Sequence, residues 1–235
     1  MLPSTPHSLL ARNGNGSHRT HMTAILYFSR NPNPRLAVAV ARHVAAPVRF
    51  EWAAPLAPGQ AENFRHLNPS LRLPILAEEG GSLWEADAIA CRLSQMTGSD
   101  FWRGGAELPD MIRWTSWARD NFMRACDAVH FERGTKRRYG LGAVDEGLIA
   151  KGMVDFHESA VILDAQLRGR DWLLASGPSY ADFRMATFLP FNDVARLPLA
   201  DYRAVTAWHQ RLMGLPAWAE PFAGLLAEEL PPISC

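Results

Sequence analysis

The stretch RNPNPRLAVAV, residues 30–40, follows an apolar strand-like run and leads into an alanine- and valine-rich helix. The first amides of a helix have no partners inside the helix and favour negative charge, so such a turn suits a reactive group. This turn offers two asparagines and two prolines but no thiol or hydroxyl. It can be an active-site turn without its nucleophile, an ordinary helix start with Asn31 as cap and Pro34 in the first turn, or both at once.

A second informative stretch is NPSLRLPILAEEGGSLWEADAIACRLS, residues 68–94. Pro74 cannot donate to a sheet ladder, so it fits a strand edge or a position after a cis bond. Leu73 then keeps its N–H and C=O free to pair with an extended ligand. Glu85 and Ala86 fall at a helix start, where amides bind a carboxylate and the Glu85 carboxylate can bind an ammonium. The pattern suits a small peptide with a free α-amino acid end, but hairpin-to-helix corners with an acid at the helix start also occur in many folds.

The elements that position these residues divide into a mixed part and a helical part. A strand, a helix and a strand within about 30 residues predict a parallel pair. The predicted order is β-α-β-α-β-β-α, over 24–28, 34–45, 47–52, 62–67, 73–77, 83–84 and 85–96. Beyond Gly104–Gly105 only helices are predicted, over 109–138, over 144–167, from a Ser-x-x-Asp capping box at Ser179, and after Pro198 and Pro216.

Composition excludes several classes of function. Lysine plus arginine equals aspartate plus glutamate, 24 each, so nucleic acid and anionic membrane are not expected as partners. No apolar run approaches the ~20 residues that span a bilayer. Three cysteines favour a reducing, cytoplasmic setting, and the scattered histidines predict no metal site. Residues 1–21 lack an apolar signal region, so we expect a disordered extension before Met22.

Residues 68–94 resemble the glutathione-binding half of the glutathione S-transferases. The matching positions are Asn68–Pro69, Arg72-Leu73-Pro74, Leu76, Leu83 and Glu85-Ala86-Asp87-Ala88-Ile89. The capping box at Ser179 and the ending over 208–218 also resemble this family, so the resemblance covers 23 to about 225. It implies a thioredoxin-like N-terminal domain over 22–99, an all-helical C-terminal domain over 106–230, and a bacterial-type layout of the Ser or Cys classes.

The resemblance also implies roles for individual residues. In the family, the turn carries a Ser, Cys or Tyr that hydrogen-bonds the sulfur of glutathione. Asn31 stands at the serine position and Asn33 at the cysteine position of some bacterial members, so both are catalytic candidates. The expected glutathione-binding residues are Leu73, Pro74, Glu85, Ala86 and Asp87.

One of these positions departs from the family pattern. Ala86 replaces the family's serine, and a lost hydrogen bond to a charged group costs about 1.5–3 kcal/mol, or roughly ten- to a hundredfold in affinity. Asp87 either binds the ammonium of glutathione or repels its carboxylate.

The helical part is expected to supply an acceptor pocket. Trp114, Trp117, Asn121 and Arg124 have helical spacing and share one predicted face, on the helix that lines the cleft in the family. An aromatic stripe is more often core than pocket, and Arg124 either receives an anionic group or is a surface arginine. The resemblance further implies a homodimer.

Three functions remain open from the sequence. The first is conjugation of the glutathione thiolate, with glutathione as co-substrate, to a small hydrophobic electrophile. The second is glutathione-dependent reduction of disulfides or peroxides, which needs no protein nucleophile if glutathione supplies both sulfurs. The third is a catalytically silent member that binds apolar ligands or a protein partner, a reading that both Asn31 and Ala86 favour.

Overall fold

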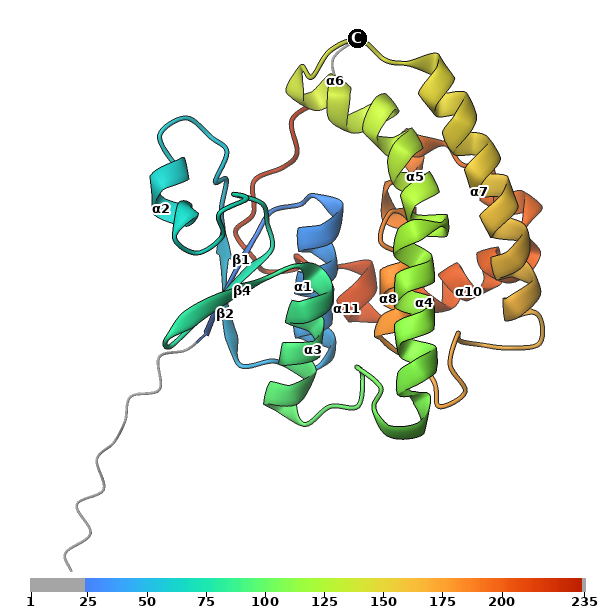
Figure 1. Cartoon of the computed structure of the whole chain (residues 1–235), viewed down its shortest axis with the longest axis horizontal. Coiled ribbons are helices and arrows are strands. Elements are labelled where there is room, and N and C mark those ends of the chain that lie inside the picture. The colour runs from blue at the N-terminus through green and yellow to red at the C-terminus, as the bar shows by residue number, and fades with distance from the viewer. Residues whose placement is uncertain (1–23, 234–235) are drawn as a thin grey trace, which may run out of the picture.

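A computed structural model describes residues 24–233, so the expected extension over 1–21 lies outside the described residues. The chain has a sheet half and a helical half, side by side (Figure 1). The sheet half contains β1 (Ala24–Phe28), α1 (Pro32–His43), β2 (Val48–Trp52), α2 (Ala61–Arg65), β3 (Ile75–Glu78), β4 (Gly81–Trp84) and α3 (Ala86–Thr97). The helical half contains α4 (Leu108–Asp120), α5 (Phe122–His130), α6 (Lys136–Tyr139), α7 (Glu146–Leu167), α8 (Tyr180–Met185), α9 (Asn192–Ala195), α10 (Arg203–Met213) and α11 (Pro216–Ala219).

The sheet has the strand order β2-β1-β3-β4. β1 pairs with β2 in parallel, while β3 is antiparallel to both β1 and β4. In β1 the buried side chains of Ala24, Leu26 and Phe28 alternate with half-buried ones, the pattern of a strand with one face on the core. The predicted order of elements is therefore confirmed, including the parallel pair.

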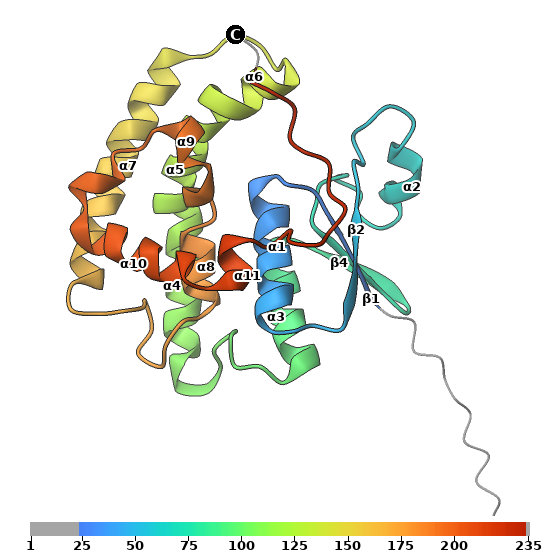
Figure 2. The same ribbon diagram turned by 180° about the vertical axis from the view of Figure 1, so that it is seen from behind.

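Helix α1 joins the two halves. It begins at Pro32, with a second proline at Pro34, and its alanine- and valine-rich interior is buried on all sides. It packs against α3 of its own half and against α8 and α11 of the helical half (Figure 2). Arg35, buried in this helix, donates to the Trp218 carbonyl and lies 4.8 Å from the centre of the Trp218 ring. The start of α1 is thus fixed by packing from both halves.

The prediction of one helix over residues 109–138 is wrong. The helix stops at Asp120, because Asn121 adopts φ −129° and ψ −96°, and α5 begins at Phe122. A second irregularity follows α5: residues Phe131–Thr135 form a π-helix, and only then does the short α6 begin. Apolar periodicity continues through both irregularities, which is why the sequence indicates a single helix.

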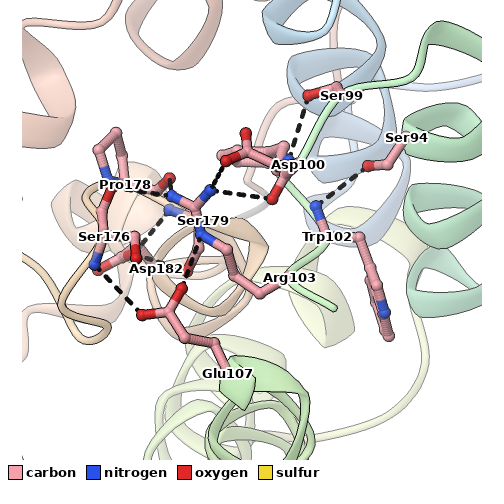
Figure 3. A network of polar contacts seen from close by, with 11 residues as sticks. Ser94, Ser99, Asp100, Trp102, Arg103, Glu107, Ser176, Pro178, Ser179 and Asp182 are labelled. Carbon is pink, nitrogen blue, oxygen red and sulfur yellow. Dashed lines mark hydrogen bonds and ion pairs between the residues drawn. The ribbon is translucent and has the colours of Figure 1, made fainter. Parts of the chain in front are cut away.

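The segment between α3 and α4 is fastened to the helical half by Arg103 (Figure 3). This buried guanidinium contacts Asp100 and donates to the carbonyl oxygens of Ser176 and Pro178 at 3.3 and 3.0 Å. The predicted capping box is confirmed, with both bonds between Ser179 and Asp182 present. The segment between α3 and α4 is therefore held against the same loop that leads into α8.

After α11 the chain returns to the sheet half and then reaches α6 (Figures 1 and 2). Phe222 stacks on Phe28 with ring centres 5.7 Å apart, and Glu229 pairs with Arg30 at 2.8 Å. Further on, the Pro231 carbonyl accepts from Arg138 at 2.6 Å.

Between residues 24 and 233, no helix is long and apolar enough to cross a membrane.

Candidate functional site

Strand register brings the three predicted site segments to one edge of the sheet. Tyr27, next to the last residue of β1, pairs with Ile75, the first residue of β3. Ile75 in turn pairs with Trp84, the last residue of β4. The turn after β1, the residues before β3 and the residues after β4 therefore lie side by side, although more than 50 residues separate the first from the last.

The segment before β3 presents free backbone groups. The Leu73–Pro74 peptide bond is cis, one of the two arrangements expected for Pro74. Within residues 24–233, neither the N–H nor the C=O of Leu73 takes part in a hydrogen bond. The approach to this point is held by the buried Asn68, which donates to the Arg72 carbonyl at 2.8 Å and accepts from the Ser70 amide at 3.0 Å. Leu73 is thus available for pairing with an extended peptide.

The start of α3 offers unpaired amides beside an unusual backbone. The first hydrogen bond of this helix runs from the Ile89 amide to the Glu85 carbonyl, so the amides of Ala86 and Asp87 precede the helical ladder. Glu85 has φ 72°, a left-handed conformation that L-residues rarely adopt, and its exposed side chain does not cap the helix. A strained non-glycine residue held at a helix start is typical of binding sites.

The turn before α1 starts the helix as expected, but the side chain of Asn31 does not cap it. Asn31 occupies the N-cap position, but its side chain forms no capping hydrogen bond. Its amide nitrogen Nδ2 instead lies 3.2 Å from Ser29 Oγ and 3.2 Å from the hydroxyl of Tyr139. Tyr139 belongs to α6, so a hydroxyl from the helical half reaches the turn.

Asn33 and Asp87 belong to a polar network that joins the halves. Arg184 of α8 donates to Asn33 Oδ1 at 2.8 Å, and its Nε lies 2.9 Å from Asp87 Oδ1. The buried hydroxyl of Tyr180 donates to the same carboxylate. Burial raises the pKa of Tyr180 well above its ordinary value, and the neighbouring Asp87 charge adds to this. The Asp87 charge is therefore already paired inside the protein.

Two further charged residues surround this network. The pKa of Arg119 on α4 is raised, first by its hydrogen bond to Asp120 and also by the charges of Asp87 and Glu85. Asp127 on α5 reaches solvent, yet partial burial by the surrounding protein raises its pKa to about 6. The positive charge of Arg184 acts in the opposite direction and lowers this pKa. Arg119 and Asp127 thus add charge from the helical half near Asp87, Glu85 and Arg184.

The four predicted acceptor-pocket residues do not form one surface. Trp114 is buried, and Trp117 packs edge-on against it with ring centres 5.7 Å apart. Asn121 is at the break between α4 and α5, where its side chain donates to the Trp117 carbonyl. Arg124 lies 3.7 Å from Asp155 of α7, a helix that lies on the side of α5 away from the sheet half (Figure 1). Because the helix breaks at Asn121, the structure does not bring Arg124 together with the tryptophans.

The residues that the sequence interpretation missed come from the helical half. Tyr139 on α6 and Arg184 on α8 contact residues at the sheet edge, and Arg119 on α4 is near enough for the charges of Asp87 and Glu85 to affect its pKa. Ser179 and Asp182 marked the start of α8, and hence the region of Arg184. No pattern marked Tyr139, because its position depends on the π-helix before it.

The cysteines and the surface groove do not contribute to this edge. Burial raises the pKa of the Cys91 thiol, in α3, and of the Cys126 thiol, in α5, so both are poor nucleophiles. A groove of about 790 Å³ lies between the end of α7 and the start of α10, lined in part by Asp164 and Arg211. Arg211 there donates to the backbone carbonyls of Arg170 and Asp171, in the loop after α7. Within residues 24–233, no three His, Cys, Asp or Glu side chains gather as a metal site.

The arrangement is that of a glutathione S-transferase fold, a thioredoxin-like domain followed by a helical domain. Residues 146–211 match the family described as "Glutathione S-transferase, C-terminal domain". A glutathione S-transferase from Rhodospirillum rubrum F11 is 21% identical, with a TM-score of 0.76, over 89% of this chain and 96% of that one. The predicted fold class is confirmed.

Two similar structures contain glutathione or a derivative of it. A glutathione S-transferase-I bound with lactoylglutathione is 18% identical, with a TM-score of 0.76, over 86% of this chain and 99% of that one. Ure2p in complex with glutathione is 17% identical, with a TM-score of 0.71, over 85% of this chain and 97% of that one. At these identities the similarity establishes the fold of this chain and not its ligand.

Proposed function

We propose that this chain is a member of the glutathione S-transferase family that conjugates the thiolate of glutathione to a small hydrophobic electrophile. The observation that carries the proposal is the convergence of three segments at one sheet edge. They are the unpaired backbone of Leu73, the free amides at the start of α3, and the Asn31 turn at the start of α1. The glutathione-bound structures with this fold support the choice of ligand.

Each part of glutathione has a partner at this edge. The N–H and C=O of Leu73 pair with the extended peptide backbone, as in the addition of a strand. The Ala86 and Asp87 amides receive the γ-glutamyl carboxylate, and Glu85 binds the neighbouring ammonium. Because Arg184 and Tyr180 pair with the Asp87 carboxylate, its charge repels the ligand less than an isolated aspartate would.

The sulfur then lies over the start of α1. The thiol proton leaves to solvent, and the amides and dipole of α1 stabilise the sulfur anion. A sulfur lone pair forms the C–S bond while the leaving group departs with its electron pair and takes up a proton from water. The protein contributes binding, thiolate stabilisation and proximity, and no covalent protein intermediate is needed.

The alternative functions differ in what the bound sulfur attacks. A disulfide reductase would direct the glutathione thiolate at a sulfur, forming a mixed disulfide and releasing a thiolate. A silent binder would have lost glutathione itself, which the alanine at position 86 and the missing turn hydroxyl favour. Comparing turnover of hydroxyethyl disulfide with turnover of an aryl halide distinguishes a reductase from a conjugating enzyme. Titration with glutathione identifies a silent binder.

We also propose a homodimer in a reducing, cytoplasmic compartment. The sheet half of one chain would face the helical half of the other, and each of these surfaces exposes large apolar side chains. Trp84 is 40% exposed on β4, and Ile112 is 51% exposed on α4. An Ile112→Asp variant should be monomeric by light scattering, whereas a monomeric wild type would contradict this arrangement.

The test of the function is calorimetric titration with reduced glutathione. Glu85→Ala should abolish binding, because it removes the partner of the ammonium. Glu79→Ala, in the β3–β4 turn at the opposite end of these strands, is a matched charge control and should bind like the wild type. Ala86→Ser should tighten binding by about tenfold or more, because it restores a hydroxyl at the carboxylate site.

The outcomes are distinct. Binding that Glu85→Ala removes and Ala86→Ser strengthens supports the site as described. A wild type that gives no heat at high glutathione concentration contradicts the proposed function.

A further inference from the structure

The side chain of Asn31 already uses both of its donors. A primary amide has two N–H groups. In Asn31, Nδ2 makes two contacts, with Ser29 Oγ and with the Tyr139 hydroxyl, each at 3.2 Å. No N–H of this side chain is left for a ligand. A direct hydrogen bond from Asn31 to sulfur would therefore require one of these contacts to break.

The hydroxyls of Ser29 and Tyr139 each accept a hydrogen bond from Asn31. A hydroxyl that accepts a hydrogen bond keeps its own proton free, and accepting one strengthens the bond it donates. Tyr139 is 43% exposed, so a ligand can reach it. Ser29 directly follows β1, two residues before Asn31. Two polarised O–H groups therefore stand beside the turn over which the proposed function places the sulfur of glutathione.

We propose that Tyr139, together with Ser29, donates the hydrogen bonds that stabilise the glutathione thiolate, and that Asn31 is the positioning residue that holds both hydroxyls. This inference rests on the proposed function, since it concerns the sulfur of that same ligand. On binding, the thiol proton passes to water and the sulfur keeps the electron pair. The two O–H groups keep their protons and point them at the anion. The hydroxyl missing from the turn is thus replaced by Ser29, just before it, and by Tyr139 from the helical half.

The structure around α6 fixes the position of this helix and therefore of Tyr139. The π-helix over Phe131–Thr135 shifts the register of the chain just before α6. Its buried Gly134 lies so close to α9 that a Cβ there would be 2.8 Å from Val194 Cγ1. The buried Glu132 receives both the Lys136 ammonium, at 2.7 Å, and the Asp145 amide, at 2.8 Å. Irregular backbone and a buried carboxylate therefore fix α6.

The test measures the pKa of the glutathione thiol bound to each variant, from the ultraviolet absorbance of the thiolate against pH. Tyr139→Phe should raise this pKa by about one to two units, the equivalent of one hydrogen bond to a charged group. Ser29→Ala should raise it in the same direction. Tyr202→Phe is the matched control, because it removes a phenol hydroxyl that pairs with His157, on α7. The control should leave the thiol pKa unchanged.

Two further measurements separate positioning from general damage. S-methylglutathione has no thiol, so its affinity should be the same for the wild type and for Tyr139→Phe. Asn31→Ala should raise the thiol pKa in the wild-type background but have little further effect in a Ser29→Ala, Tyr139→Phe background. Residues that act through one another are non-additive, whereas a direct donor would add its full effect in both backgrounds.

The results distinguish this inference from the proposed function. A wild-type thiol pKa in Tyr139→Phe, with glutathione bound normally, would overturn the inference and leave the function standing. Such a result means that the Tyr139 hydroxyl does not donate to the sulfur. Additive effects of Asn31→Ala would likewise overturn its positioning role. A wild type that does not bind glutathione would overturn both.

Discussion

Asp87→Asn separates a structural role of this residue from a ligand-binding one. The substitution keeps the shape of the side chain and removes the charge that faces Arg184. The Arg184 side chain is only 6% exposed, with Nε 2.9 Å from Asp87 Oδ1. Its other close partner is the neutral Asn33 Oδ1, at 2.8 Å. After the substitution, a buried cation is left with two neutral partners.

The expected cost follows from this burial. Removing one partner of a fully buried ion pair costs about 3–5 kcal/mol, because the other charge remains buried and uncompensated. The Asp87 side chain is 32% exposed, so water already screens part of the interaction. Asp127 also supplies negative charge near Arg184. We therefore expect a loss of about 2–3 kcal/mol, which lowers the melting temperature by roughly 4–12 °C in a chain of this size.

Urea unfolding with an unchanged m-value measures this loss. Glu78→Gln is the matched control, since it makes the same chemical change in the surface pair between Glu78 and Arg92. That pair should contribute less than about 1 kcal/mol. An Asp87→Asn variant that destabilises the protein no more than the control does would refute this role of Asp87. Glutathione affinity should change little, because the backbone amide of residue 87 remains.

Three other changes test the packing, the titration and the strain of the fold. Gly134→Ala should destabilise the protein by about 1–3 kcal/mol in urea, since its Cβ would meet Val194 at 2.8 Å, and Val194→Ala should partly restore stability. Burial, then the Arg138 charge, lowers the pKa of His130 to about 4 from its ordinary 6.5. The contribution of neutral His130 to the free energy of unfolding is therefore present above pH 6.5. It is lost as the pH falls towards 4, by about 2 kcal/mol at pH 5. His130→Phe should flatten the dependence of the unfolding free energy on pH in this window. Glu85→Gly should raise stability by up to about 1 kcal/mol, by relieving the positive φ, while calorimetry shows loss of glutathione binding.

The sheet half was predictable from the sequence because its signals are local. Pro74, the Gly80–Gly81 turn and the acid at position 85 each mark one corner of a continuous segment, and their spacing fixes the strand register. The capping box at Ser179 is equally local, since both of its bonds fall within four residues. The structure confirms these elements and their order.

The helical contribution to the site was not predictable for the opposite reason. Asn121 breaks the long helix with a backbone conformation that hydrophobic periodicity does not register, and the π-helix then changes the direction of the next turn. The contact between Asn31 and Tyr139 joins residues 108 positions apart, and nothing in the local sequence of either indicates it. Roles for Arg119 and Arg184 likewise depend on how the two halves dock.

A hydroxyl supplied by the helical half makes the reactivity of the thiol depend on docking. In a turn-borne arrangement, the donor and the helix start move together, so the sulfur keeps its hydrogen bond even when the halves separate slightly. Here the donor Tyr139 belongs to one half, and Asn31, which orients it, belongs to the other. Arg184 crosses the same boundary to Asn33, two residues further along the same helix start. A change that loosens the contact of Arg184 should therefore raise the thiol pKa without touching the sulfur, so stability and thiolate formation should decline together across substitutions along this boundary.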